Sequence, residues 1–332
     1  MKKLSLLLAL VLILGLLFGC TQDKPDTPEI PDAPETSDTD KPAQNEHDTV
    51  VDPEPDSDPV VVETPVFDEK TLPLLDGSTA TIPLSEGIVQ ALLGYDAAQA
   101  QDFVKHNTTH NAYVNLIDGK CDLIFVTPPS ADEYAMMDDS GRKFAVERVV
   151  KDAFVFLVNK DNPVEDISLA DLQKIYRGEI TNWKELGGTD APIKAFQRPD
   201  NSGSQTLMYK LVVPQDEIMP APTEMRPGGM DDLVDAVSDY DEGLHSLGYS
   251  VYYYASGMYT DPGSKMISVD GVYPTDETIA DGSYPLTDGY YAVYDREHGV
   301  HSPVGQLLAW LRAENGQKVA QASGYVPLMP LN

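Results

Sequence analysis

The chain has few cysteines and few basic residues, and both shortages limit what it can be. It contains two cysteines, Cys20 and Cys121, in 332 residues, which is too few for a disulfide framework. Lysine and arginine together number 23 against 54 aspartates and glutamates, so the formal net charge at pH 7 is −31. A charge of this sign and size argues against nucleic acid and against anionic membrane surfaces as partners.

Residue patterns that carry catalysis or metal chemistry are also scarce. Among the six histidines, His106 and His110 are four positions apart, but the Asn107-Thr108 step between them predicts a turn, so they do not share a helix face. The sequence contains no Gly-x-Ser-x-Gly turn of the kind that carries a nucleophilic serine. Its histidines and cysteines do not follow the spacing of metal ligands. We therefore expect no enzyme activity, no metal and no cofactor.

A single long apolar run stands at the start of the chain. It covers residues 4–18, follows two lysines, and is too short to cross a bilayer comfortably. Residues 1–19 therefore predict a signal peptide. Cys20 follows directly, an arrangement that resembles the bacterial lipobox, in which this cysteine is acylated and becomes the mature N-terminus. We predict a lipoprotein held at the outer face of the cell membrane through Cys20. An ordinary secreted protein with a chance cysteine is the alternative.

Residues 21–60 have almost no apolar side chains. They contain thirteen acidic residues, two lysines and eight prolines. Such a segment cannot bury enough surface to offset the entropy of ordering it, and its prolines and like charges favour an extended chain. We predict that residues 20–65 form a disordered acidic tether between the lipid anchor and a folded body. An acidic binding segment is the alternative.

The remaining residues alternate between helix and strand patterns, which predicts an α/β fold. Cys121 precedes an apolar strand and is expected to be a small core residue. A helix capped by Thr108 or Thr109 is expected to end near Gly119. Further helices are expected at 83–93, 169–176, 230–237, 304–311 and 316–322, and strands at 103–104, 122–126, 153–158, 193–197, 247–254 and 290–294.

The stretch "FQRPDNSGSQTLMYK", residues 196–210, has the composition of an anion site at a helix start. Ser202 and Ser204 offer hydroxyls and Gly203 allows close approach to backbone N–H groups, which are unpaired at a helix N-terminus. Arg198 adds a planar pair of donors, and Asp200 could hold it by a salt bridge. The alternative is that Ser202 only caps the helix and Arg198 is a surface charge.

Two further helix starts are rich in hydroxyl groups. In "DGSTATIPL", Ser78, Thr79 and Thr81 stand where an anion-binding helix start needs them, although no Gly-Lys-Ser/Thr follows, so the stretch is not a P-loop. "NTT" at 107–109 is the third start. Each alone could be a turn with a helix cap. Together they favour one binding site.

These stretches carry a family resemblance that covers roughly residues 70–330. With "CDLIFVTPPS", "ISLADLQKIYRGEITNWKELGG" and "SGYVPL", the chain resembles the PstS-like phosphate receptors of ABC importers, in the periplasmic-binding-protein superfamily. The resemblance implies two α/β lobes of the type II kind, joined by a hinge, with the ligand in the cleft between them. Lobe 1 would comprise 66–151 plus 288–332 and lobe 2 would comprise 152–287, with the chain crossing near 150–152 and 286–289.

The resemblance also implies a set of ligand contacts. One lobe would supply Arg198, Ser202, Gly203 and Ser204, and the other Ser78, Thr79, Ala80 and Thr81. Thr108 matches a ligand-contacting serine of the family. Thr127 stands where the family carries an aspartate that accepts the proton of hydrogen phosphate, so discrimination against sulfate is in doubt.

The function that the resemblance implies is capture of inorganic phosphate, or a related tetrahedral oxyanion, and its delivery to an ABC permease by a monomeric, membrane-anchored lipoprotein. The alternative is a sensory or adhesive surface protein that keeps the fold without transport. In that case the tyrosine cluster at 249 and 252–254 could be a contact surface, although its strand alternation favours packing in the core and at the hinge.

Overall fold

A computed structural model describes residues 62–239 and 243–331, all of them within the compact unit Asp48–Asn332. The predicted signal peptide, the predicted lipidation site Cys20 and most of the predicted tether lie outside the described residues. Within the described ranges, no helix has both the length and the apolar composition needed to cross a membrane.

A mixed β-sheet runs through the fold. Its strands follow the order β1-β2-β9-β3-β6-β5, β7 also pairs with β3, and β4 pairs with β8 in a separate small sheet. Helices alternate with these strands along the chain, which confirms the predicted α/β class. The strands are β1 (Leu75–Gly77), β2 (Leu123–Val126), β3 (Phe144–Asn159), β4 (Asp166–Ile167), β5 (Lys194–Ala195), β6 (Ser246–Val251), β7 (Ser264–Met266), β8 (Ser268–Val269) and β9 (Thr287–Asp295).

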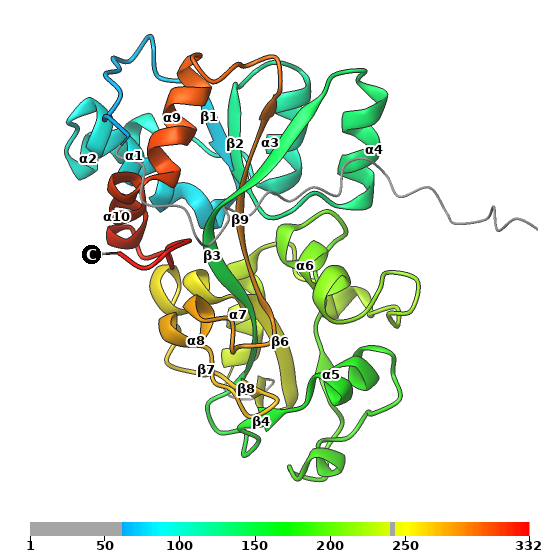
Figure 1. Ribbon diagram of the computed structural model, residues 1–332. Coiled ribbons are helices and arrows are strands. Elements are labelled where there is room, and N and C mark those ends of the chain that lie inside the picture. Colours follow the sequence, from blue (N-terminus) through cyan, green and yellow to red (C-terminus); the bar gives the residue numbers. More distant parts are fainter. Residues whose placement is uncertain (1–61, 240–242, 332) are drawn as a thin grey trace, which may run out of the picture. The chain divides into compact units, whose positions relative to one another are not determined.

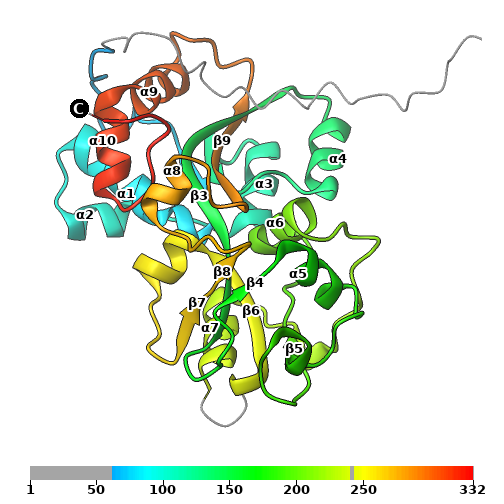
Figure 2. The ribbon, with the colours of Figure 1, turned by 60° about the horizontal axis from the view of Figure 1, so that its bottom comes forward.

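The helices gather around two ends of the sheet (Figures 1 and 2). We call β1, β2, α1–α4, α9 and α10 lobe 1, and β4–β8 with α5–α7 lobe 2. The α-helices are α1 (Ile82–Leu93), α2 (Ala97–Phe103), α3 (Thr109–Ile117), α4 (Ala131–Asp139), α5 (Leu169–Tyr176), α6 (Gly203–Leu211), α7 (Met230–Ser238), α8 (Asp276–Ala280), α9 (Pro303–Arg312) and α10 (Glu314–Ala322). Short turns of 3₁₀ helix are η1 (Thr79–Thr81), η2 (Trp183–Leu186), η3 (Thr223–Met225) and η4 (Gly243–His245), and η5 (Tyr254–Met258) is a π-helix.

Strands β3 and β9 connect the two lobes. Figure 1 shows both running from the lobe 1 helices toward α7. β3 pairs with β9 as far as Ala153, and from Phe154 onward it pairs with β6 of lobe 2. One continuous strand therefore belongs to both parts of the sheet. The lobe boundaries at 151/152 and 287/288 stay a prediction.

Strand β2 shows how the lobe 1 core is layered. Leu123 and Phe125 join the larger hydrophobic core, whereas Ile124 and Val126 join a smaller core under α3 and α4. This alternation follows from the two-residue period of a strand. Cys121 lies buried in the smaller core as predicted, and burial raises the pKa of its thiol to about 12.

The tyrosine cluster mostly packs inside the protein. The side chain of Tyr249 is fully buried among Phe154, Phe156 and Tyr176, with ring centroids 5.0–6.4 Å from its own. Tyr254 is also buried, at 7% exposure. These two residues are therefore not available as an open contact surface.

Several predicted elements are wrong or incomplete. The strand predicted at 103–104 is the end of α2, whose start is fixed by a capping box between Asp96 and Gln99. The strand predicted at 247–254 ends at Val251 and gives way to the π-helix η5. Helix α4 and the first half of β3 were not predicted. Charged residues interrupt the apolar pattern of that half-strand, and their partners, such as Arg312 for Glu147, are remote in sequence.

Gln317 fastens α10 to the crossing strand. Its buried side-chain amide donates to the carbonyl oxygens of Val149 and Leu311, both at 2.9 Å, and its oxygen accepts from the N–H of Leu328 at 2.7 Å. We expect Gln317→Leu to lower the free energy of unfolding by about 2–3 kcal/mol, because buried backbone groups lose their partners. Urea denaturation measures this change.

The control is Gln321→Leu, at an exposed position of the same helix. It should change the free energy of unfolding by less than about 0.5 kcal/mol. Equal stability of the Gln317→Leu variant and the original chain would contradict this role.

Candidate functional site

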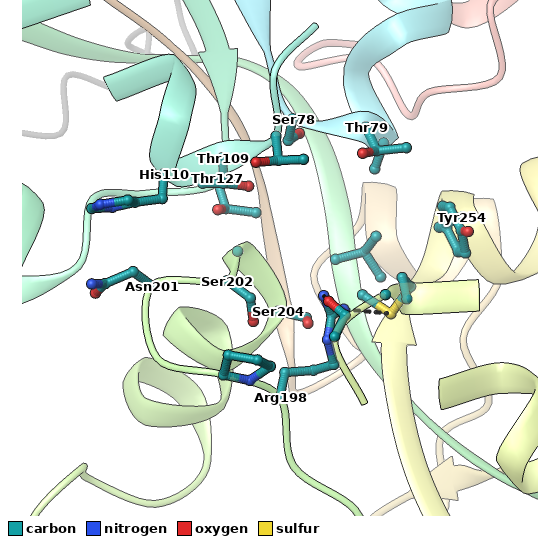
Figure 3. Close-up of a pocket in the computed structure, with 18 of the residues that line it drawn as sticks. Ser78, Thr79, Thr109, His110, Thr127, Arg198, Asn201, Ser202, Ser204 and Tyr254 are labelled. Atoms are coloured by element: carbon teal, nitrogen blue, oxygen red, sulfur yellow. Dashed lines mark hydrogen bonds between the residues drawn. The ribbon is translucent and has the colours of Figure 1, made fainter. Parts of the chain in front are cut away.

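A cavity of about 490 Å³ lies between residues of the two lobes, and most of the predicted site residues line it (Figure 3). Its polar lining comes mainly from the starts of helices. The predicted residues in its wall are Ser78, Thr79, Ala80, Thr108, Thr127, Arg198, Asp200, Ser202, Gly203 and Ser204.

The first wall of the cavity is the turn that leads into α1. The N–H of Ser78 donates to the carbonyl oxygen of Phe125 at the end of β2, 3.0 Å away, which fixes the turn beside the sheet. Ser78 is buried, while Thr79 is exposed toward the cavity. Residues 78–80 thus reach the cavity from lobe 1 as predicted.

The structure does not place Thr81 among the ligand contacts, in contrast to the prediction. Its side chain is fully buried and its hydroxyl donates to the carbonyl oxygen of Phe125 at 2.6 Å. It is not among the residues that line the cavity. Thr81 therefore holds the turn in place, together with His106, whose Nδ1 lies 2.9 Å from the carbonyl oxygen of Ser78.

The start of α3 forms the second wall. Thr108 precedes the helix with a positive φ of 69°, and its side chain makes no capping bond. A positive φ is costly for a threonine, and Asp76 supports this loop by accepting from the backbone N–H of Asn107 at 2.8 Å. The next residues, Thr109 and His110, also line the cavity and were not predicted as ligand contacts.

Thr127 follows the buried strand β2 and lines the cavity near Thr109 (Figure 3). It is 3% exposed, and its Oγ1 is buried without a hydrogen-bond partner among the described residues. Its backbone is held because the hydroxyl of Tyr113 donates to its carbonyl oxygen at 2.9 Å. A buried hydroxyl without a partner is costly, so a ligand with an oxygen at this point would satisfy it.

The start of α6 faces Thr127 from lobe 2. Ser202 caps the helix through Gln205, with a distance of 3.4 Å between its Oγ and the backbone nitrogen, so the cap interpretation is correct for its side chain. Ser204 differs, because its Oγ is buried and has no hydrogen-bond partner in the described part of the chain. Both residues line the cavity.

Arg198 is buried, at 8% exposure, and its guanidinium is held by main-chain carbonyls. Nε donates to Pro227 at 3.1 Å and Nη2 to Gly228 at 2.6 Å, while Nη1 lies 3.7 Å from the sulfur of Met230. Burial lowers the pKa of Arg198, against the attraction of nearby acidic groups. The arginine is therefore a fixed, desolvated cation in the cavity wall rather than a surface charge.

The predicted role of Asp200 is wrong. Its carboxylate accepts from the hydroxyl of Tyr209 at 2.6 Å and lies 3.7 Å from Arg226. The carbonyl groups of the 227–228 segment hold Arg198 instead. Asp200 lines the cavity at an exposed position, so it adds negative charge to the rim.

The start of α7 is a part of the site that sequence reasoning missed. Gly228, Gly229, Met230 and Asp231 all line the cavity. The Gly-Gly pair directly before an apolar periodic segment was the available signal, since glycine lets a helix start approach a ligand closely. Tyr254 and Asn201 also line the cavity, although neither was predicted as a ligand contact.

Four helix starts in the described part of the chain therefore meet at this cavity: η1 leading into α1, α3, α6 and α7. The first N–H groups of a helix have no partner within the helix, and the helix dipole adds positive potential at its start. Together with Arg198 they favour an anion. Within the described residues, no group of three or more histidine, cysteine, aspartate or glutamate side chains is arranged to hold a metal ion.

The lobes touch beside the cavity. The side chain of Asn201 donates to the Asp132 carboxylate of α4 at 3.0 Å. A methyl group added at Gly203 would lie 2.6 Å from Thr127 Oγ1 and 2.9 Å from Thr109 Oγ1. Only glycine at position 203 permits this approach, which explains the glycine in the stretch 196–210.

A buried carboxylate lies where the lobes join. Asp152 is 4% exposed and accepts from the N–H groups of Ala153 at 2.8 Å and Tyr253 at 3.1 Å. Burial raises its pKa to about 7. Asp288, its register partner on β9, forms an ion pair with Lys210, in which Nζ lies 2.9 Å from Oδ2.

This carboxylate should make stability depend on pH. The folded-state pKa of Asp152 lies above its ordinary value of 3.8, so stability falls as the pH rises from about 4 to about 7 and stays lower above that. Asp152→Asn keeps an oxygen acceptor and cannot ionise. We expect the stability gained by the variant to be larger at pH 8 than at pH 4, by up to about 4 kcal/mol.

Denaturation by urea at the two pH values measures the difference. Asp161→Asn, at an exposed position, is the matched control and should show no such change with pH. A pH-independent effect of Asp152→Asn would contradict the burial argument.

Comparisons with known proteins place the chain among binding proteins. A profile of the PBP superfamily domain matches residues 73–314. The phosphate-binding protein PstS of Bacillus subtilis is 31% identical over 172 residues, which are 52% of this chain and 53% of that protein. PstS of Borreliella burgdorferi is 28% identical over 179 residues, 53% of this chain and 63% of that protein. The matched region spans less than two thirds of these relatives.

Solved structures show a similar fold. A protein from Clostridium perfringens with bound phosphate, provisionally described as a phosphate ABC transporter substrate-binding protein, aligns with a TM-score of 0.59 at 24% identity over 76% of this chain and 98% of its own. An ABC-type phosphate transport receptor from Vibrio cholerae aligns with a TM-score of 0.56 at 20% identity over 77% and 99%. The predicted two-lobed fold is confirmed by these similarities.

Proposed function

The chain belongs to the PBP superfamily, and from this premise we propose that it is an extracytoplasmic solute-binding protein that captures inorganic phosphate or a related tetrahedral oxyanion. Two buried hydroxyls support this proposal most directly. Thr127 and Ser204 have no hydrogen-bond partner among residues 62–239 and 243–331, and with the buried Arg198 they line a cavity where helix starts converge. An oxyanion accepts hydrogen bonds on every side, so it satisfies these donors at once.

Binding in this cavity relies on short-range contacts. The net charge of −31 repels an anion at long range. Hydroxyls, backbone N–H groups and one fixed guanidinium act only at contact, and they act more strongly where water is excluded. The residues proposed to contact the oxyanion are Ser78, Thr79, Ala80, Thr108, Thr109, Thr127, Arg198, Ser202, Gly203 and Ser204.

We infer that β3 and β9 act as the hinge of lobe closure, near residues 150–152 and 286–289. The proposed cellular role is delivery of the captured anion to an ABC permease by a monomer anchored through an acylated Cys20, with binding and no catalysis. The names of the similar proteins, which are called phosphate-binding proteins, support the capture of phosphate in this role.

Arg198→Ala tests the position of the anion. Because the variant removes a charged hydrogen-bond partner, we expect phosphate binding to weaken by at least about 2 kcal/mol. Isothermal titration calorimetry measures it. Arg177→Ala is the control, since its guanidinium pairs with Glu217 away from the cavity wall. Unchanged affinity in the Arg198→Ala variant would place the ligand elsewhere.

Thr127→Asp tests whether the residue at this position determines the selectivity between protonated phosphate and unprotonated sulfate. A threonine hydroxyl can donate or accept, whereas a carboxylate repels an oxyanion that has no proton to give. We expect the variant to lower sulfate affinity at least tenfold more than phosphate affinity at pH 7. Thr127→Asn, which has a similar size and no charge, should keep the ratio of the two affinities near that of the original chain. An equal loss for both anions in the aspartate variant would show that Thr127 does not set this selectivity.

A further inference from the structure

The cavity is larger than the anion proposed for it. Its volume is about 490 Å³, whereas a water molecule takes about 30 Å³ of the liquid and a tetrahedral oxyanion needs the room of roughly four waters, about 120 Å³. Contacts at Gly203 and Asn201 already bring the lobes together on one side. The extra space therefore lies away from the point where the lobes touch.

The wall of the cavity divides into two regions. His110, Asn201, Ser202 and Ser204 lie on one side of the Arg198 guanidinium, and Tyr254 lies on the other side (Figure 3). Thr79 also lies on the side of Tyr254 (Figure 3). The cavity wall includes residues with apolar or aromatic side chains, namely Ala80, Met230, Val251, Tyr254 and Tyr290, of which the last three are at most 7% exposed.

Arg198 stands at the boundary between the two regions. Its Nη1 faces the sulfur of Met230 at 3.7 Å, and carbonyl groups occupy Nε and Nη2. The guanidinium therefore has few N–H groups left for a ligand and can hold only one side of a phosphoryl group. The Arg198 side chain leaves the part of the cavity next to Tyr254 open.

The charge on the rim limits what can occupy that region. Asp231 lies at an exposed position in the first turn of α7 and lines the cavity. Burial, together with the nearby Asp231 carboxylate, raises the pKa of Tyr254 to about 12. A second negative group placed beside Tyr254 would be repelled, whereas a neutral or cationic group would not.

We propose that the cavity takes phosphate as a monoester of a small neutral or cationic organic group, with the phosphoryl group at the hydroxyl-lined region and the organic group against Met230, Val251 and Tyr254. This inference rests on the proposed function, because it assumes that the same hydroxyls and Arg198 hold the phosphoryl oxygens. It adds a class of ligand that inorganic phosphate does not represent.

Calorimetry on the purified full chain tests the proposal with four probes: inorganic phosphate, phenyl phosphate, phosphoethanolamine and phosphoglycolate. We expect phenyl phosphate and phosphoethanolamine to bind at least as tightly as inorganic phosphate, and phosphoglycolate, with its extra carboxylate, to bind at least tenfold more weakly than either. If both esters bind more weakly than inorganic phosphate, this inference is overturned and the proposed function stands. If none of these probes binds, the inference is overturned, and absence of binding by sulfate and arsenate as well would overturn the proposed function.

Tyr254→Ala locates the organic group. We expect the ratio of phenyl phosphate affinity to inorganic phosphate affinity to fall at least fivefold, whereas Tyr273→Ala, at an exposed position of lobe 2 outside the cavity wall, leaves the ratio unchanged. Should Tyr254→Ala not fold, Met230→Ala provides the same test. A ratio unchanged in a folded Tyr254→Ala or Met230→Ala variant would contradict the assignment.

Discussion

The structure depends on hydrogen-bond donors that the protein leaves without internal partners. Thr127 and Ser204 each bury a hydroxyl with no partner among the described residues, and helix starts from both lobes present their N–H groups to the same space. Keeping such groups unpaired costs free energy in the absence of a ligand. The same groups are already positioned to donate hydrogen bonds when an oxyanion enters. The groups that lower the stability of the free protein are therefore the groups that bind the ligand.

The arrangement also explains how a very acidic protein can bind an anion. Arg198 is fixed by carbonyl oxygens rather than by a carboxylate, so its positive charge remains available inside the cavity. The acidic residues Asp200 and Asp231 stand at exposed positions on the rim. Arg198 therefore attracts an anion only within a few ångströms, inside the cavity, where screening by water is weak.

Local patterns were enough to predict much of this arrangement. Hydroxyl-rich helix starts predicted three of the four starts that line the cavity, and the apolar runs predicted β2 and the second half of β3. Two failures depend on local signals, because the capping boxes that start α2 at Asp96 and α4 at Ser130 were not recognised. Two others depend on contacts remote in sequence. Thr81 looks like a ligand residue but bonds to Phe125. Asp200 looks like the partner of Arg198, yet the nearer groups come from a segment almost thirty residues away.

The most direct test is a crystal structure of the protein grown with arsenate, whose anomalous scattering marks the anion. The account predicts one strong peak at the arsenic of an anion whose oxygens lie within hydrogen-bond reach of the Arg198 guanidinium, Thr127 Oγ1 and Ser204 Oγ. A peak elsewhere on the protein, or an empty cavity at saturating arsenate, would contradict it.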